Sequence, residues 1–327
     1  MMRRLFIVLA AAMILLSACA PGGGEASTSA PTTSSAGAEQ SAQGTCTFTD
    51  SLGNTVELEQ PPKRVAALLG SYAETWLLAG GEVVAVTQDA YDERGLELPE
   101  DTVNLGANQQ PDLEALFAAE PDLVLLTPDL DGQMGLRDSL EAAGIPAAWF
   151  KVETFDDYLN MLKICTDLTG RSDLYQKNGL DIQSEIDAAI ASVPEGEAPT
   201  VLLLRAYSSG VRAKNSDNIA GAILKDLGAA NIADSDSGLL EDLQMESILA
   251  ADPEFIFVTT MGASQEAALK SLDELLHSDP AWQTLTAVKE DRVEVLPKDL
   301  FHYKPNARWG ESYQMLAELM YGSGETA

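Results

Sequence analysis

Short apolar runs alternate with amphipathic stretches along most of this chain. Each run has the length of a buried strand, and the stretches between the runs carry apolar residues at helical spacing. The predicted strands cover residues 65–69, 83–87, 123–127, 147–152, 201–204, 255–259 and 293–296. The predicted helices cover residues 73–78, 113–119, 136–143, 219–227, 245–250 and 269–275. Strands that alternate with helices imply parallel sheets covered by helices on both faces.

A different pattern precedes this alternation. Residues 47–58 alternate apolar and polar positions on both sides of Gly53-Asn54. A dipeptide of Gly and Asn between two alternating segments is typical of a tight turn, so we predict a small β-hairpin here.

A longer amphipathic stretch, residues 172–193, lies near the middle of the chain. Ser172 or Asp173 can cap the start of a helix here, and Pro194 ends it. A helix of about 20 residues is ~30 Å long, which suits a strut between two lobes. An ordinary amphipathic surface helix is the alternative interpretation. The apolar residues predicted to share one face are Tyr175, Ile182, Ile186, Ala189, Ile190 and Val193.

The sequence before the central helix is repeated after it. Residues 113–124 and residues 245–256 both read as the start of a helix, a proline turn and a strand. Pro121 and Pro253 lie 132 residues apart, as do Glu114 and Glu246. Agreement over three successive features predicts two homologous lobes.

We therefore predict an α/β protein with two homologous Rossmann-like lobes, joined by one long helix, with a ligand cleft between them. The predicted divisions are a signal peptide at 1–18, a flexible tether at 19–44, an N-terminal lobe at 45–154, a helical segment that includes the interlobe helix at 155–194, and a C-terminal lobe at 195–327.

The first residues have the layout of an export signal. Arg3 and Arg4 precede an apolar run at residues 5–16, and small residues lead into Cys19. Residues 16–19 resemble the lipobox of bacterial lipoproteins, which implies that Cys19 is acylated and holds the protein on the extracytoplasmic face of the cell membrane. An ordinary cleaved signal is the alternative. Residues 20–44 are rich in Gly, Ser, Thr and Ala, which is typical of a flexible tether.

The charge of the chain argues against one class of partner. The net charge is −31, and it becomes −33 when Arg3 and Arg4 leave with the signal peptide. A body this acidic repels phosphate backbones, so we expect no binding to nucleic acids. We expect the protein to be a monomer.

Two cysteines remain when Cys19 is acylated. Cys46 and Cys165 form an even pair in an exported protein, which is typical of a disulfide. Two buried thiols are the alternative, and the sequence leaves this choice open because it does not give the Cα separation.

Several motifs resemble one family of transport proteins. They are Val65-Ala66-Ala67-Leu68, Ser71-Tyr72-Ala73-Glu74, Asp112-Leu113-Glu114-Ala115-Leu116, Pro121-Asp122-Leu123-Val124 and Ala281-Trp282. They resemble the substrate-binding proteins of ABC importers for siderophores, cobalamin and haem, over nearly all of residues 47–321. The resemblance implies a bilobed protein with one helical hinge and limited closure. It also implies an ABC permease and its ATPase as partners, with Glu114 and Glu246 as docking residues.

Candidate ligand residues follow the predicted strands, where ligands of α/β sheets bind. Tyr72 and Tyr91 lie on such loops of the first lobe and could stack on a large conjugated ligand, or cover hydrophobic surface instead. Arg94, Asn108, Gln109 and Asp129 lie on the same loops. The second-lobe candidates are Arg205, Tyr207, Arg212, His302, Tyr303 and Lys304.

These cations suit the oxygens of a metal chelate. We therefore expect a ferric siderophore as ligand, with cobalamin or haem as alternatives; iron or cobalt would come with the ligand. Haem-binding relatives often carry a tyrosine where this chain has Ala107, which disfavours haem. Arg308 is expected to act as a structural anchor at the start of the last helix.

Other chemistries have little support in the sequence. His277 and His302 are the only histidines, and no His or Cys set has the close spacing of a metal site, so we expect no resident metal or cofactor. No nucleophile elbow, P-loop or dinucleotide fingerprint is present, so we do not expect an enzyme. An extracellular α/β enzyme or a sensor remains the alternative from another class.

Overall fold

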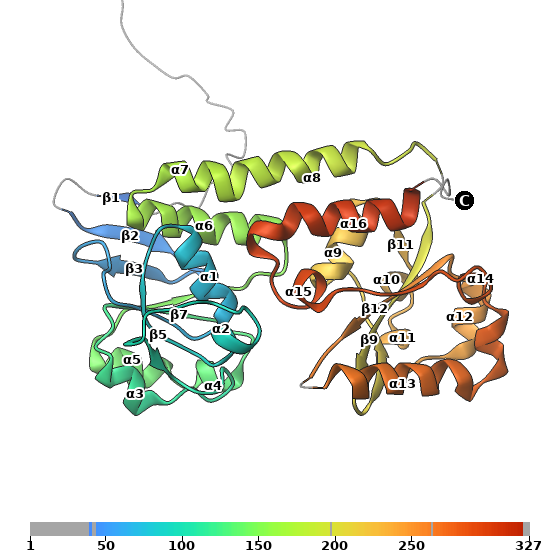
Figure 1. Cartoon of the computed structure of the whole chain (residues 1–327), viewed down its shortest axis with the longest axis horizontal. Helices are drawn as coiled ribbons and strands as arrows, with labels where there is room; N and C mark the ends of the chain where they lie inside the picture. The colour runs from blue at the N-terminus through green and yellow to red at the C-terminus, as the bar shows by residue number, and fades with distance from the viewer. Residues whose placement is uncertain (1–38, 41–43, 197, 263, 323–327) are drawn as a thin grey trace, which may run out of the picture. The chain divides into compact units, whose positions relative to one another are not determined.

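The structure is a computed structural model of the chain, and it describes residues 39–40, 44–196, 198–262 and 264–322 (Figure 1). The predicted signal peptide, with Cys19, lies outside the described residues, as does most of the predicted tether. The tether was predicted to extend to residue 44, but β1 (Glu39–Gln40) pairs with β2 (Cys46–Thr49). No helix in the described ranges is both long and apolar enough to cross a membrane.

The N-terminal half contains a parallel five-stranded sheet with the strand order β6-β5-β4-β7-β8. Its strands are β4 (Val65–Ala67), β5 (Val83–Val86), β6 (Val103–Asn104), β7 (Leu123–Leu126) and β8 (Ala147–Trp149). Its helices are α1 (Gly70–Leu78), α2 (Asp89–Asp92), α3 (Leu113–Ala118), α4 (Asp131–Met134) and α5 (Arg137–Ala143). The predicted hairpin is present as β2 and β3 (Thr55–Leu58), which pair antiparallel.

The C-terminal half contains a second sheet with the order β10-β9-β12-β13, in which β11 also pairs with β9. Its strands are β9 (Thr200–Tyr207), β10 (Gly210–Ala213), β11 (Ala230–Asn231), β12 (Phe255–Thr260) and β13 (Val293–Val295). Its helices are α9 (Ile219–Asp226), α10 (Ile232–Ser235), α11 (Gly238–Glu241), α12 (Met245–Ala251), α13 (Gln265–Ser278), α14 (Thr286–Lys289), α15 (Lys298–Phe301) and α16 (Trp309–Tyr321). β10 was not predicted; it runs antiparallel to β9 and places Arg212 opposite Arg205.

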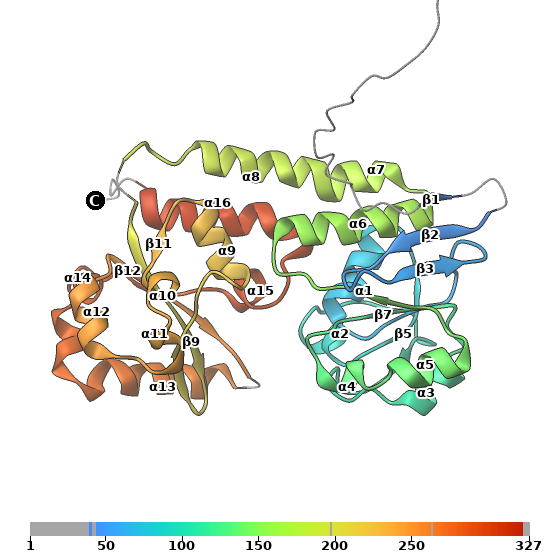
Figure 2. The ribbon, with the colours of Figure 1, turned by 180° about the vertical axis from the view of Figure 1, so that it is seen from behind.

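The two halves are connected by helices. α6 (Phe155–Thr169) begins with a capping box formed by Thr154 and Asp157. The predicted central helix follows as α7 (Ser172–Tyr175), a π-helical turn (Gln176–Leu180) and α8 (Asp181–Ala191). Both views place α8 beside α16 (Figure 1, Figure 2).

The central helix differs from its prediction in three respects. The π-helical turn interrupts it where Gly179 lies so close to α6 that a Cβ there would be 2.8 Å from Leu159 Cδ1. Ile182 and Ile186 are buried as predicted, but Ile190 is exposed, because it lies at the edge of the buried face of α8. The N-cap is Arg171, without a capping side chain.

One hydrophobic core extends across both sheets on the side of α6, α8 and α16. Ala67 of β4 and Leu203 of β9 face this shared core, whereas their neighbours Ala66 and Leu202 face separate cores on the opposite sides of the two sheets. This division follows from the period of two along a strand. The two halves are therefore joined by packing as well as by the central helix.

The duplication predicted from residues 113–124 and 245–256 extends to the backbone. Glu120 and Asp252 precede the two equivalent prolines, and both adopt positive φ, 46° and 39°. A left-handed conformation is uncommon for residues other than glycine. The acids that follow these prolines accept hydrogen bonds from backbone amides: Asp122 from Arg64, and Glu254 from Thr200. In both halves, the same arrangement of a left-handed residue, a proline and an acid thus lies beside the start of a central strand.

Candidate functional site

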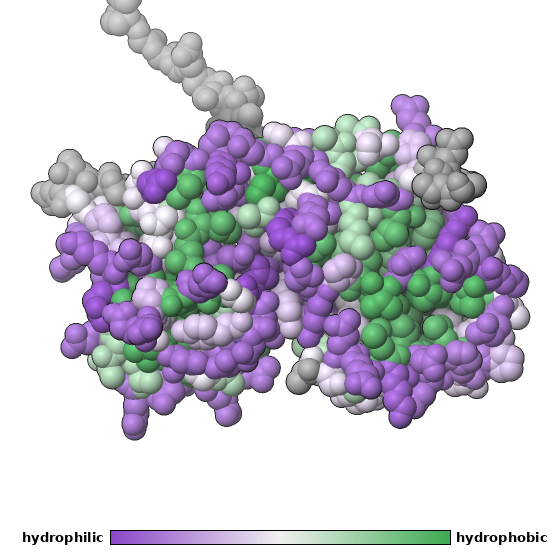
Figure 3. All heavy atoms as spheres, viewed as in Figure 1, coloured by the Kyte–Doolittle hydropathy of each residue, from purple (hydrophilic) through white to green (hydrophobic). Residues whose placement is uncertain are grey.

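A pocket of about 920 Å³ lies where the strands of both sheets end. This volume is within the range of small-molecule sites, and the position at strand ends is the usual one in α/β folds. The space-filling view shows the corresponding hollow between the two halves, with mostly hydrophilic residues around it (Figure 3).

The pocket is lined from both halves. N-terminal residues are Leu69, Ser71, Asp89, Asp92, Glu93, Arg94, Asn108, Gln109, Thr127, Asp129, Leu130, Val152 and Glu153. C-terminal residues are Arg205, Asn218, Ile219, Met261, Gly262, Lys298, Phe301, His302, Tyr303 and Lys304. Arg205, His302, Tyr303 and Lys304 were predicted, and the structure brings them together. The prediction missed Lys298. This residue follows β13, so the rule that ligand residues follow strands could have identified it.

Arg205 lies near the end of β9, where its Nε donates to Thr259 Oγ1 of β12 at 3.3 Å. Burial lowers the pKa of Arg205. Lys298 Nζ donates to the Gly262 carbonyl at 2.9 Å and lies 4.9 Å from the ring centre of Tyr303. Burial also lowers the pKa of Lys304, although Asp129 and Glu153 act in the opposite direction. The C-terminal wall thus holds partly desolvated cations, which bind anions more strongly than cations in free solution do.

His302 is the neutral member of this wall. Burial, together with the charges of Arg205, Lys298 and Lys304, lowers its pKa from 6.5 to about 3. A neutral imidazole can accept a hydrogen bond or bind a metal centre carried by a ligand.

The pKa of His302 makes stability depend on pH. As the pH falls below 6.5 the unfolded chain takes up the proton first, so folding free energy is lost between pH 6.5 and about 3. Between pH 7 and pH 4.5 we expect the wild type to lose about 1 to 2 kcal/mol more than His302→Gln, allowing for solvent screening. Urea unfolding at the two pH values measures this, with exposed His277→Gln as control. Equal losses in wild type and His302→Gln would contradict it.

The N-terminal wall carries all the carboxylates that line the pocket in the described residues. Asp89 accepts hydrogen bonds from the Gly70 amide at 2.7 Å and from Thr87 Oγ1 at 2.5 Å. Burial and the neighbouring Asp89 raise the pKa of Glu93. Asp92 and Glu93 gave no signal in the sequence because acidic residues occur throughout this chain.

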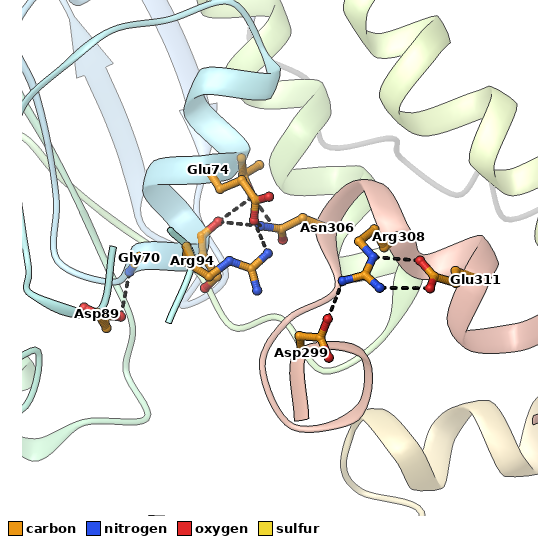
Figure 4. A network of polar contacts seen from close by, with 10 residues as sticks. Gly70, Glu74, Asp89, Arg94, Asp299, Asn306, Arg308 and Glu311 are labelled. Atoms are coloured by element: carbon orange, nitrogen blue, oxygen red, sulfur yellow. Dashed lines mark hydrogen bonds and ion pairs between the residues drawn. The ribbon is translucent and has the colours of Figure 1, made fainter. Parts of the chain in front are cut away.

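Arg94 connects the pocket to a network of polar contacts at α1 (Figure 4). Its side chain is 8% exposed and forms an ion pair with Glu74, while its Nε has no hydrogen-bond partner in the described parts of the chain. Glu74 also accepts a hydrogen bond from Asn306, whose amide donates to the Ser71 carbonyl as well. Asn306 lies in the 3₁₀ turn (Asn306–Arg308) before α16, so this network attaches the C-terminal segment to the N-terminal half.

Arg308 has the anchoring position that the sequence predicted. It forms ion pairs with Asp299 and Glu311 next to the start of α16, as Figure 4 shows. These partners raise its pKa, and it does not line the pocket.

The structure contradicts the prediction that Tyr72 contacts ligand. Tyr72 is 1% exposed, and its hydroxyl donates to the Phe150 carbonyl at 2.5 Å. α1 begins at Gly70, earlier than predicted, so Tyr72 is a helical residue that faces the core. Tyr91 also lies outside the pocket, because it packs half-buried against the same core.

Tyr207 and Arg212 do not line the pocket either. Tyr207 ends β9, two positions beyond Arg205, the residue of this strand that lines the cavity. Arg212 is exposed on β10, beside Arg205 in the antiparallel register. The antiparallel hairpin, which the sequence prediction lacked, holds Arg212 at the outer edge of the sheet.

The two remaining cysteines are not bridged to each other. Cys165 is a free, buried thiol on the inner face of α6, and burial raises its pKa. Of the two alternatives that the sequence left open, the structure thus shows a buried thiol at Cys165 and no disulfide to Cys46 of β2.

Glu114 and Glu246 occupy equivalent places, in the first turns of α3 and α12. Both are exposed, and neither forms an ion pair with any described residue. One turn later, Phe117 and Leu249 are 36% and 38% exposed. The duplication therefore presents the same acidic and apolar pair on each half. No group of three or more metal-binding side chains occurs in the described residues.

Comparisons with known proteins agree with this architecture. A family model described as periplasmic binding protein matches residues 65–300. The chain is 27% identical over 256 residues to the Fe(3+) dicitrate-binding periplasmic protein FecB of Escherichia coli, covering 76% of this chain and 80% of that protein. It is 21% identical over 243 residues to the Fe(3+)-citrate-binding protein YfmC of Bacillus subtilis, covering 73% and 74%. The solved structure of an ABC transporter substrate-binding protein from Listeria monocytogenes matches with a TM-score of 0.65 at 22% identity, covering 79% of this chain and 98% of that one.

The family match begins at β4 and ends in α15, so it includes both sheets and most residues that line the pocket. The resemblance predicted from the sequence motifs is thereby confirmed. The chain belongs to the periplasmic binding protein family.

Proposed function

We propose that this protein is the substrate-binding component of an ABC importer and that it delivers a ferric siderophore-type chelate to a permease and its ATPase. The pocket carries the proposal: it lies at the strand ends of both sheets, it has a volume of about 920 Å³, and its C-terminal wall holds Arg205, Lys298 and Lys304. Desolvated cations suit the oxygens of a carboxylate chelate. The names of FecB and YfmC, both ferric citrate binders, support the same ligand class.

A haem or corrinoid ligand is the second candidate, and one observation favours it. His302 is neutral and borders the pocket beside Tyr303, with 5.4 Å between the ring centres, so both side chains could approach a metal carried by the ligand. Ala107, at the position where haem-binding relatives often have tyrosine, argues against haem.

The proposed location is the extracytoplasmic face of the cell membrane, with a lipid anchor at Cys19. The lipobox-like residues 16–19 support it. Glu114 and Glu246 are proposed to contact the permease, and their equivalent exposed positions support this role. Members of the family are binding proteins, so we propose no enzymatic activity, no resident cofactor and a monomeric state.

A ligand screen tests the proposed function. The purified protein is titrated with ferric citrate-type and hydroxamate chelates, cobalamin and haem, and binding is followed by tryptophan fluorescence and by calorimetry. We expect a ferric carboxylate chelate to bind at least about tenfold more tightly than cobalamin or haem, because the chelate is polar and anionic throughout, whereas haem offers anionic oxygens only at its two propionates and cobalamin only at one phosphodiester. Preferred binding of haem would favour the second candidate, and no binding of any metal chelate would contradict the proposed function.

A further inference from the structure

The charges around the pocket are separated by sign. The C-terminal wall contributes Arg205, Lys298 and Lys304, and no carboxylate occurs among the C-terminal residues that line the pocket in the described part of the chain. His302 adds no charge near neutral pH, because its pKa lies far below its usual value. This wall is therefore purely cationic.

The opposite wall is acidic. Its lining residues include five carboxylates and one cation, Arg94. Glu74, which lies outside the lining, pairs with Arg94 and neutralises it, so Arg94 does not offset the acidic wall. Lys151 pairs with Glu153 at 2.8 Å and offsets it in the same way, so four of the five carboxylates have no ion-pair partner among the described residues. The carboxylates are Asp89, Asp92, Glu93, Asp129 and Glu153.

Within the described ranges, no ion pair joins the two walls, although Asp129 and Glu153 act on the pKa of Lys304, and Lys298 acts on the pKa of Glu93. Among the ion pairs of the described residues, none joins Arg205, Lys298 or Lys304 to a carboxylate. The contact between Tyr303 and Glu93 crosses the pocket, but a phenol leaves the charge of the carboxylate in place. An electric field therefore points across the cavity, from the C-terminal wall to the N-terminal wall.

A second observation indicates that a ligand group is received at the acidic wall. The Arg94 side chain lines the pocket, is 8% exposed, and keeps its Nε without a hydrogen-bond partner in the described residues. A buried donor of this kind is costly unless something accepts from it. An acceptor atom of a bound ligand, such as a carbonyl or hydroxyl oxygen near its amine, would satisfy it, whereas a protonated amine could not because it only donates.

We propose that the ligand is a metal chelate that carries both positive and negative charge. Its cationic amine would lie toward Glu93 and Asp129, and its anionic oxygens would lie toward Arg205, Lys298 and Lys304. The proposal rests on the proposed function and narrows it. A purely anionic chelate gains from one wall and is repelled by the other, whereas a ligand with both charges gains from both.

A matched pair of ligands tests whether the protein prefers a chelate that carries both charges. The probes are the ferric complex of a citrate-derived chelator that carries one primary amine and the ferric complex of its N-acetylated form, titrated by calorimetry into the full-length protein in detergent. We expect N-acetylation to weaken binding about tenfold or more, because it removes the positive charge that would pair with Glu93 and Asp129. The Glu93→Gln, Asp129→Asn double variant should reduce this difference to about twofold.

The control is Glu97→Gln, an exposed acid on the same loop that does not line the pocket, and it should keep the full difference. Equal binding of the two complexes, tighter binding of plain ferric citrate, or a difference that persists in the double variant would each overturn the proposal and leave the proposed function intact. Failure of all ferric chelates to bind would instead overturn the proposed function, and the preference for a chelate that carries both charges with it.

Discussion

The Glu114→Arg, Glu246→Arg double variant is expected to bind its ligand with unchanged affinity and yet to lose at least about 90% of ATP-driven uptake. Both residues are exposed at the starts of equivalent helices and lie outside the pocket. If cationic pockets of a permease receive them, two arginines replace attraction by repulsion at both contacts, and each like-charge contact costs several kcal/mol. Uptake and ligand-stimulated ATPase activity in vesicles that contain the permease measure the effect.

The matched control is Asp138→Arg, Glu266→Arg. These acids also lie in first helical turns, in α5 and α13, and are exposed, so their reversal removes the same favourable interaction with the helix dipole. We expect this control to retain uptake. Normal uptake by the Glu114 and Glu246 variant, or an equal loss in the control, would show that these glutamates have no docking role.

Arg205→Ala is expected to weaken ligand binding by about 2 to 4 kcal/mol, because it removes a partly desolvated charge from the cationic wall of the pocket. Arg212→Ala is the natural control. It removes the same type of side chain from the neighbouring strand, directly across from Arg205, but Arg212 is exposed outside the pocket. We expect it to change affinity by less than about 0.5 kcal/mol.

Calorimetric titration with the best ferric chelate measures both variants, and thermal unfolding shows whether each remains folded. Removal of either arginine relieves a like-charge pair on adjacent strands, so Arg212→Ala should not lower stability. Arg205→Ala also loses the hydrogen bond to Thr259 Oγ1, so we expect it to remain folded with a small loss of stability. Equal losses of affinity in the two variants would mean that the exposed arginine also contacts ligand, contrary to the geometry.

The longer strands and the parallel architecture were predictable because buried parallel strands are continuous apolar runs, whereas β6 and β11, of two residues each, are too short to give such a run. β10 was missed because Gly210 and Arg212 interrupt its apolar pattern, and only pairing with β9 makes it a strand. The π-helical turn was also beyond local patterns, since it depends on the close approach of Gly179 to α6.

The site was predictable in part. The rule that ligand residues follow strands identified Arg205 and His302, but it failed at Tyr72. There the chain enters α1 at once, because Gly70 can pack against α2: a Cβ at Gly70 would lie 2.6 Å from the Ala90 nitrogen. Which loop residue becomes helical and turns inward thus depends on a contact 20 residues away in sequence, which a local pattern does not contain.

The shared core changes what the central helix contributes. Trp309 of α16 packs against Phe155 of α6 at 6.1 Å between ring centres, and Asn306 binds α1. The halves are therefore also attached noncovalently, through a shared hydrophobic core, like an obligate subunit interface, which resembles a domain core cut in two. In this respect the two halves pack against each other like two related subunits that have been joined in one polypeptide. The central helix links the two halves covalently and so keeps them close together, while the side-chain packing between them determines how strongly they associate.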